Sequence, residues 1–260
     1  MKLKYPSRDV TIYVILLFLV ILVMIRQMFL QEWNNVFLCI LTIALFTIPS
    51  IIDKRLNIHL PNALENSIIL FIFSAYILGE IVNFYGTFKY WDSLLHIVNG
   101  FLCAAIGFSL IDILNRKEFL HFKMTPIFVA LVAFCFSMTI GVFWELLEFS
   151  SDIVLKTDMQ KDSLMSSIST VYLDPEQNNN PVIIDNIIRT VIYSLDKDGN
   201  IVQIVIENGY LDIGLIDTMK DLAVNFIGAT IFSIIGFLYI SNREGYRFAE
   251  KFILIRKRKE

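Results

Sequence analysis

Apolar residues gather in six long runs along this 260-residue chain, separated by shorter polar stretches. The runs cover residues 10–30, 36–53, 64–85, 93–115, 126–149 and 221–241. A helix that crosses a bilayer takes about 20 predominantly apolar residues, so each run is long enough. The pattern therefore predicts an all-α polytopic membrane protein with six transmembrane helices.

Local signals indicate where several of these helices begin or bend. Asn62 and Glu65 have the spacing of a capping box, which predicts the start of the third helix. Thr125 before Pro126 has the residue types favoured at the N-cap and first position of the fifth helix. Because proline lacks an N–H group, Pro49 should kink the second helix near its end.

The stretch between the last two apolar runs predicts a small soluble part. Thr190–Leu195 and Ile201–Glu207 are β-prone runs separated by a turn-forming segment, which favours a hairpin. Acidic and amide residues of the turn also match several positions of an EF-hand calcium loop. Ile201 stands where that loop needs glycine, so the plain hairpin is favoured.

We therefore expect three parts along the chain. Residues 1–155 hold the first five transmembrane helices, and residues 156–216 form a small, partly β insert. Residues 217–260 hold the sixth helix and a basic tail.

The basic residues predict the orientation of the spans. On one side of the membrane they are Lys2, Lys4, Arg8, Lys54, Arg55, Arg116, Lys117, Lys123, Arg243, Arg247, Lys251, Arg256, Lys257, Arg258 and Lys259. The short loops of the other side carry Lys89 and little else. Because cytoplasmic loops are enriched in lysine and arginine, we expect a cell-membrane protein with both termini cytoplasmic and residues 156–216 extracytoplasmic.

Composition agrees with this class of protein. The chain is 56% hydrophobic, against about 45–50% in soluble domains. Cys39, Cys103 and Cys135 all lie inside apolar runs, which indicates unpaired packing cysteines and no disulfide framework. The net charge of −3 is small, and we expect the lipid bilayer, with no nucleic acid, as the partner.

Ionisable residues at the ends of three apolar runs are the strongest indication of function. They form three pairs that the predicted topology places on the extracytoplasmic side: Asp92 and His96, Glu145 and Glu148, and Asp217 and Asp221. Such groups are costly at membrane depth, so they persist mainly when paired, hydrated or bound to an ion. Further polar residues that could support them are Glu80, Asn99, Asp152 and Asn225.

Closely packed carboxylates cannot all stay ionised unopposed, and three arrangements would resolve this. A divalent metal (Zn²⁺, Mn²⁺ or Mg²⁺) could bind among all six of these residues. Some carboxyls could instead be protonated, or a cationic substrate or headgroup could sit there. For a single residue, a structural role is as good an interpretation as a functional one, but the whole set on one face favours function.

The motifs also resemble known families. Asp92-Ser-Leu-Leu-His96 with Gly100, Trp144-Glu145-Leu-Leu-Glu148, and Asp217-Thr-Met-Lys-Asp221 with Asn225 and Gly228-Ala229 resemble the YjdF-like bacterial membrane proteins across residues 60–240. A weaker resemblance is to VanZ-like membrane proteins, which are implicated in resistance to glycopeptide antibiotics. There Glu148 replaces an expected glutamine. Both resemblances imply a polar site at the outer end of the helices and supply no reaction.

Three functions from different classes remain open. The first is a site, metal-dependent or acid–base, that acts on a lipid-linked or cell-wall precursor, with Glu145, Glu148 and Asp221 as candidate catalytic groups. The second is a proton- or cation-coupled transporter, although no inverted repeat is evident. The third is a non-catalytic scaffold or sensor. The sequence leaves open whether the protein is an enzyme.

Overall fold

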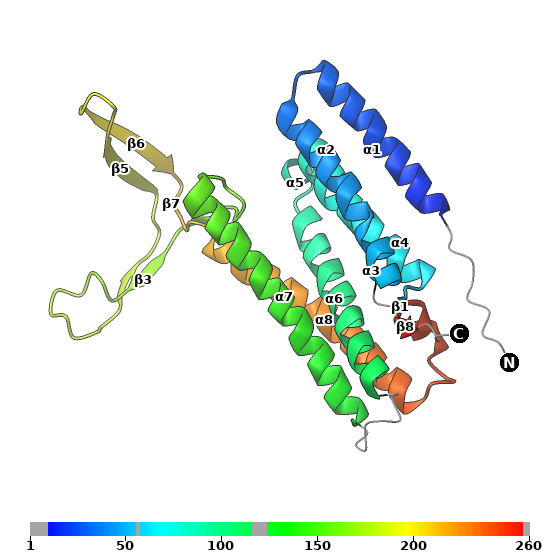
Figure 1. Cartoon of the computed structure of the whole chain (residues 1–260). Helices are drawn as coiled ribbons and strands as arrows, with labels where there is room; N and C mark the ends of the chain where they lie inside the picture. Colours follow the sequence, from blue (N-terminus) through cyan, green and yellow to red (C-terminus); the bar gives the residue numbers. More distant parts are fainter. Residues whose placement is uncertain (1–9, 56–57, 116–123, 257–260) are drawn as a thin grey trace. The chain divides into compact units, whose positions relative to one another are not determined.

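The computed structural model describes residues 10–55, 58–115 and 124–256, and it is mostly helical (Figure 1). Within these residues, six helical stretches are long and apolar enough to cross a membrane, which confirms the predicted fold class. The chain divides into two compact units. The helical unit comprises residues 1–143 and 221–260, and the insert unit comprises residues 144–220.

Several basic residues used to predict the orientation lie outside the described residues. They are Lys2, Lys4, Arg8, Arg116, Lys117, Lys123, Lys257, Arg258 and Lys259.

The first two spans pack against each other as α1 (Thr11–Phe29) and α2 (Trp33–Phe46) with its continuation α3 (Ile48–Arg55). The second span breaks at Thr47, two residues before Pro49, so the predicted kink is confirmed. The Ala44 carbonyl accepts both the Thr47 N–H, at 3.1 Å, and the Thr47 hydroxyl, at 2.6 Å, so Thr47 closes the helix at the break.

The third span begins as α4 (Asn62–Phe73) and continues as the π-helical turn η1 (Ser74–Ile81). The predicted capping box is wrong here. Asn62 is already helical, and the preceding Pro61 takes the N-cap position with no side-chain cap. The Pro61 carbonyl accepts the Glu65 N–H at 3.0 Å, so the backbone itself opens the helix. A short helix, α5 (Phe84–Thr87), follows.

Three long helices complete the set: α6 (Trp91–Asn115), α7 (Pro126–Leu155) and α8 (Leu215–Ser241). The Thr125 hydroxyl accepts the Phe128 N–H at 3.4 Å, which confirms the predicted start of the fifth span. Helix α7 runs six residues beyond its apolar run, and α8 begins six residues before its own. Both added segments mix polar and apolar residues, so the predicted apolar runs end before the helices do.

Helices α6 and α8 lie in close backbone contact within the helical unit (Figure 1). A methyl group at Gly100 would collide with the Asn225 carbonyl, and one at Gly228 would collide with the Ile97 carbonyl. Around this contact the buried core includes Phe108, Phe232 and Ala229. Small residues allow such close approach between membrane helices, and here they fix the register of α6 against α8.

The end of the chain folds back onto the helical unit. The segment η2 (Arg247–Lys251) is followed by β8 (Ile255–Arg256), which pairs antiparallel with β1 (Ile58–His59). Ile253 and Leu254 are buried, and the Leu254 N–H donates to the hydroxyl of buried Ser109 at 2.9 Å. The carboxyl-terminal segment is therefore part of the helical core.

The insert unit contains three small antiparallel pairs. These are β2 (Leu164–Met165) with β7 (Tyr210–Leu211), β3 (Ile168–Thr170) with β4 (Val182–Ile184), and β5 (Arg189–Leu195) with β6 (Ile201–Glu207). The last pair confirms the predicted hairpin. Asp196 Oδ1 accepts the N–H groups of Asp198 and Asn200, at 2.9 and 2.8 Å, as expected of a plain turn.

Candidate metal centre

The first turns of α6 carry two of the predicted ligands on one helical face. Asp92 and His96 are four residues apart, a spacing that stacks their side chains one turn above the other. His96 Nε2 lies 3.7 Å from Asp92 Oδ1. The two groups therefore form one local pair that needs no other helix.

Helix α8 brings the third group. Asp221 Oδ2 lies 3.9 Å from His96 Nε2, and one ligand atom from each of Asp92, His96 and Asp221 falls within 4.8 Å of the others. The glycine contacts between α6 and α8 lie one and two turns further along, so the same register that packs the helices places Asp221 beside His96. We call these three residues the acidic triad site.

Burial within the triad is uneven. The side chains of His96 and Asp221 are 7% and 2% exposed, whereas that of Asp92 is 31% exposed. Two carboxylates around one imidazole give the site net negative charge when the imidazole is neutral, so it favours a cation. Solvent or a ligand would reach the site from the side of Asp92.

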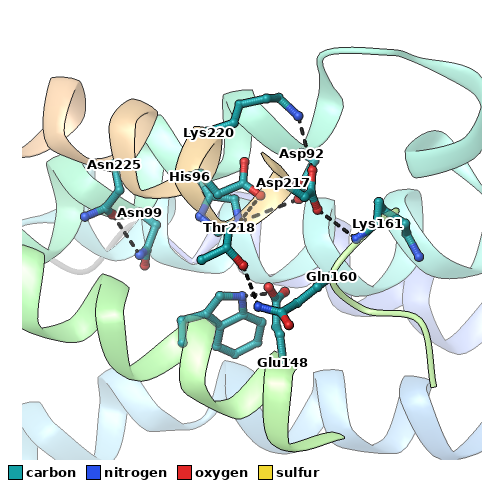
Figure 2. A network of polar contacts seen from close by, with 12 residues as sticks. Asp92, His96, Asn99, Glu148, Gln160, Lys161, Asp217, Thr218, Lys220 and Asn225 are labelled. Atoms are coloured by element: carbon teal, nitrogen blue, oxygen red, sulfur yellow. Dashed lines mark hydrogen bonds and ion pairs between the residues drawn. The ribbon is translucent and has the colours of Figure 1, made fainter. Parts of the chain in front are cut away.

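Two amides lie beside His96, to its left in Figure 2, and join the same two helices. Asn99 Nδ2 donates to Asn225 Oδ1 at 3.3 Å, and Asn99 Oδ1 accepts from the Cys103 thiol at 3.5 Å. Asn225 is fully buried. Both amides were predicted to support the site, and their hydrogen bond links α6 to α8 one turn away from His96 and Asp221.

The other predicted acids belong to the insert unit. Glu145 and Glu148 are buried on α7, and Glu148 Oε1 accepts from the Trp144 indole N–H at 2.9 Å. Asp217 Oδ2 accepts the Lys161 backbone N–H at 3.0 Å, and its Oδ1 lies 3.3 Å from Lys220 Nζ (Figure 2). The structure thus brings half of the predicted six-residue ligand set together in the triad.

Two further predicted residues have different surroundings. Asp152 accepts hydrogen bonds from the Thr157 hydroxyl and from the N–H groups of Met159 and Gln160, at 2.7 to 2.8 Å, so it shapes the chain that leaves α7. Glu80 lies on η1 with an exposed side chain and is not among the triad atoms.

Sequence reasoning missed a second polar cluster on α6. Asp112 is 1% exposed, and its Oδ1 accepts from Arg243 Nη2 at 2.9 Å. Arg243 also donates to the Tyr239 hydroxyl at 3.4 Å. The signal was present, because Asp112 is an acid within an apolar run, but no motif drew attention to it. Sixteen residues of helix place Asp112 about 24 Å along the axis from His96.

Comparison with known proteins identifies the family. The model of a family described as a predicted membrane protein (DUF2238) matches residues 10–242, and the chain belongs to this family. An uncharacterized protein of Thermotoga maritima is 26% identical over 107 residues, which cover 41% of this chain and 53% of that relative. The match thus spans about half of the relative's length. No solved structure matches.

The family, together with the six apolar helices, establishes a multi-pass membrane protein. The resemblances to YjdF-like and VanZ-like proteins stay predictions.

Proposed function

We propose that this member of the family binds a divalent metal ion at the acidic triad site and uses it at the extracytoplasmic surface on a lipid-linked or cell-wall substrate. The observation that carries the proposal is the convergence of Asp92, His96 and Asp221 from two helices, with one ligand atom each within 4.8 Å. Oxygen and imidazole donors suit Zn²⁺ or Mn²⁺, and Mg²⁺ less well because it prefers oxygen.

The spacing of the donor atoms supports this assignment. Ligands about 2.1 Å from a tetrahedral zinc ion stand roughly 3.4 Å from each other. The distances from His96 Nε2 to the two carboxylates, 3.7 and 3.9 Å, exceed this by a few tenths of an ångström. All three donor atoms lie within 4.8 Å of one another, so the widest separation would have to shorten by up to roughly 1.4 Å when the ion binds.

Three protein ligands are the number typical of catalytic zinc sites, which keep one position for water or substrate. A bound metal there would lower the pKa of a coordinated water and polarise a phosphoryl or carbonyl oxygen. Asp92 is the most exposed of the three ligands, so its side of the site would admit the substrate. Glu145 and Glu148 are proposed as the groups that accept or return a proton.

The proposed side of the membrane follows from charge. Lys54, Arg55, Arg243 and Arg247 would lie on the cytoplasmic side together with both termini, which assigns the triad and residues 156–216 to the extracytoplasmic side. A site at that depth meets the headgroups of the outer leaflet, which is why a lipid-linked envelope precursor is the proposed substrate class.

The first test is elemental mass spectrometry of protein purified in detergent without chelators. We expect close to one zinc or manganese ion per chain, and loss of that ion in folded His96→Ala and Asp221→Asn variants. The matched control is Asp217→Asn, which removes an acid of α8 that lies outside the triad and should keep the metal. If both the His96→Ala and the Asp221→Asn variants keep the metal, the proposed site is refuted.

The second test addresses chemistry. Phosphate release from a polyprenyl pyrophosphate in detergent should depend on the added metal and fall at least 100-fold in His96→Ala. If the protein binds metal but shows no metal-dependent turnover of lipid-linked phosphates or cell-wall precursors, the proposed catalytic function is refuted. The protein would then be a metal-binding protein without this activity.

One observation favours a second candidate, a proton- or cation-coupled transporter. Buried polar groups occur at both ends of α6, with His96 near one end and Ser109 and Asp112 near the other. A transporter needs such groups in both halves of the membrane. Ion flux into proteoliposomes that is abolished in a folded Asp112→Asn variant would favour this function over the envelope enzyme.

A further inference from the structure

The β5–β6 hairpin of the insert unit exposes an apolar surface on both of its faces. Its register places Val191 opposite Val205, Tyr193 opposite Gln203, and Leu195 opposite Ile201. Directly opposed residues share one face of a sheet, so these six side chains form a continuous surface, here called the Tyr193 face. Its apolar members are 36–75% exposed.

This hairpin lacks what normally stabilises two strands. Across the described residues, β5 and β6 hydrogen-bond to each other and to no third strand, so both outer edges are open. A two-stranded hairpin is marginal in water, and a stable one packs its apolar face against something. No proline or charged residue interrupts Ile201–Ile206, although such residues commonly protect open edges.

We propose that the Tyr193 face is the contact through which two copies of this chain associate. Its five apolar side chains are 36–75% exposed. A homodimer interface of about 800 Å² per partner that is about 65% apolar needs roughly 500 Å² of apolar surface from each copy, and a continuous patch of five large side chains is the kind of surface that provides it. The Tyr193 face therefore supplies the apolar core that a stable dimer requires. In a two-fold symmetric dimer the same face of each copy contacts the other, so no second surface is needed.

Charge agrees with self-association. Arg189 and Glu207 oppose each other at the base of the Tyr193 face and cancel, while its centre carries no charge. Two copies can therefore stack without like charges facing each other at the centre of the contact.

Lipid is a poor occupant of this surface. The hairpin carries Arg189 and Lys197 against Asp196, Asp198 and Glu207, which sum to −1, so anionic headgroups do not attract it. Insertion into hydrocarbon would also leave the backbone groups of both open edges without hydrogen bonds, which membranes do not tolerate.

The test is the mass of the purified 260-residue protein in detergent, measured by light scattering. The chain is 30.0 kDa, and we expect twice that protein mass for the parent. The Leu195→Thr/Ile201→Thr variant should raise the dimer dissociation constant at least tenfold. The matched control is Ile192→Thr/Ile204→Thr, which replaces two large aliphatic residues on the opposite face of the same strands and should stay dimeric.

A second measurement works in native membranes and does not depend on detergent. Gln203→Cys, on the Tyr193 face, should form an intermolecular disulfide under mild oxidation, and Ser194→Cys, on the opposite face, should not. A monomeric parent, equal dissociation by both double variants, or equal cross-linking at both positions would overturn the proposal. A monomer that sediments with phosphatidylglycerol vesicles through this face would overturn it in favour of lipid.

Discussion

Arg243 Nη2 on the segment after α8 lies 2.9 Å from Oδ1 of Asp112, a carboxylate that is 1% exposed on α6. The guanidinium also lies over the Tyr239 ring, with its central carbon 5.0 Å from the ring centroid. One arginine thus joins α6, the end of α8 and an aromatic side chain, about 24 Å along α6 from the triad.

Removal of this arginine should destabilise the helical unit. Loss of one partner of a fully buried pair costs about 3–5 kcal/mol, and Arg243 is 40% exposed, so we expect about 1–3 kcal/mol for Arg243→Ala. Thermal unfolding in detergent measures it. Lys220→Ala, which breaks the more exposed pair with Asp217, should change stability by less than about 1 kcal/mol. Equal effects from the two variants would contradict the structural importance of the buried pair.

The contact between α6 and α8 predicts a second effect, on geometry. Alanine normally stabilises a helix by about 1 kcal/mol relative to glycine, but at Gly100 its methyl group would meet the Asn225 backbone. Gly100→Ala should therefore lower the unfolding temperature and weaken metal binding, because the helices that carry His96 and Asp221 must separate. Metal titration by calorimetry on folded protein checks the second part.

The matched control lies on the same helix. At Gly107 the new methyl group would meet Cβ, Cγ and Cδ1 of Phe136 on α7 at 2.8 Å, so the substitution disturbs the packing of α6 against α7 and not against α8. Gly107→Ala should therefore leave metal affinity within about threefold of the parent. If both substitutions weaken binding alike, the α6–α8 register is not what positions the triad.

Helix positions and the short-range pairs of this chain could be read from its sequence, because they depend on hydropathy and on i to i+4 spacing. Asp92 with His96, the break before Pro49 and the β5–β6 turn are of this kind. The pairing of His96 with Asp221 spans 125 residues and depends on how two glycines let helices approach. The sequence offered Asp221 as a candidate but no means to choose it over Asp217.

The errors have the same origin. The capping box at Asn62 failed because Pro61 supplies the first carbonyl, a choice that depends on how the chain arrives at α4. Asp112 was overlooked because its importance comes from Arg243, 131 residues away. Patterns along a chain identify costly groups, whereas packing decides which distant group compensates them.

Asp152 provides a prediction that separates structure from chemistry. Its three hydrogen bonds, from Thr157, Met159 and Gln160, hold the chain at the end of α7. Asp152→Ala should therefore cost about 1–3 kcal/mol and leave the metal content unchanged. Asp92→Ala should have the opposite effect: the protein should lose the metal but little stability, because the Asp92 side chain is 31% exposed. Metal loss in a folded Asp152→Ala variant would show instead that Asp152 supports the site.

Asp212 connects the start of α8 to the strand region of the insert unit and predicts a pH effect. Partial burial raises its pKa, but hydrogen bonds from the N–H groups of Ser163, Ile216 and Gly214 outweigh burial and hold the pKa below its ordinary value. The first two of these bonds are 2.7 and 2.8 Å long. The folded state therefore prefers the ionised carboxylate.

The sign of the effect follows from this shift. A group whose pKa is lower in the folded state stabilises the folded protein, and this contribution is complete at pH values above its unfolded pKa, about 3.9. The contribution is lost as the pH falls through the folded pKa. We expect amide protection at Ser163 and Ile216, measured by hydrogen exchange and corrected for intrinsic rates, to be constant from about pH 7 to pH 5 and to decline below about pH 4. Asp212→Asn should lower protection at neutral pH and remove the decline, because an amide does not titrate. Protection in the parent that stays constant to about pH 2 would show that these contacts do not depend on the charge of Asp212.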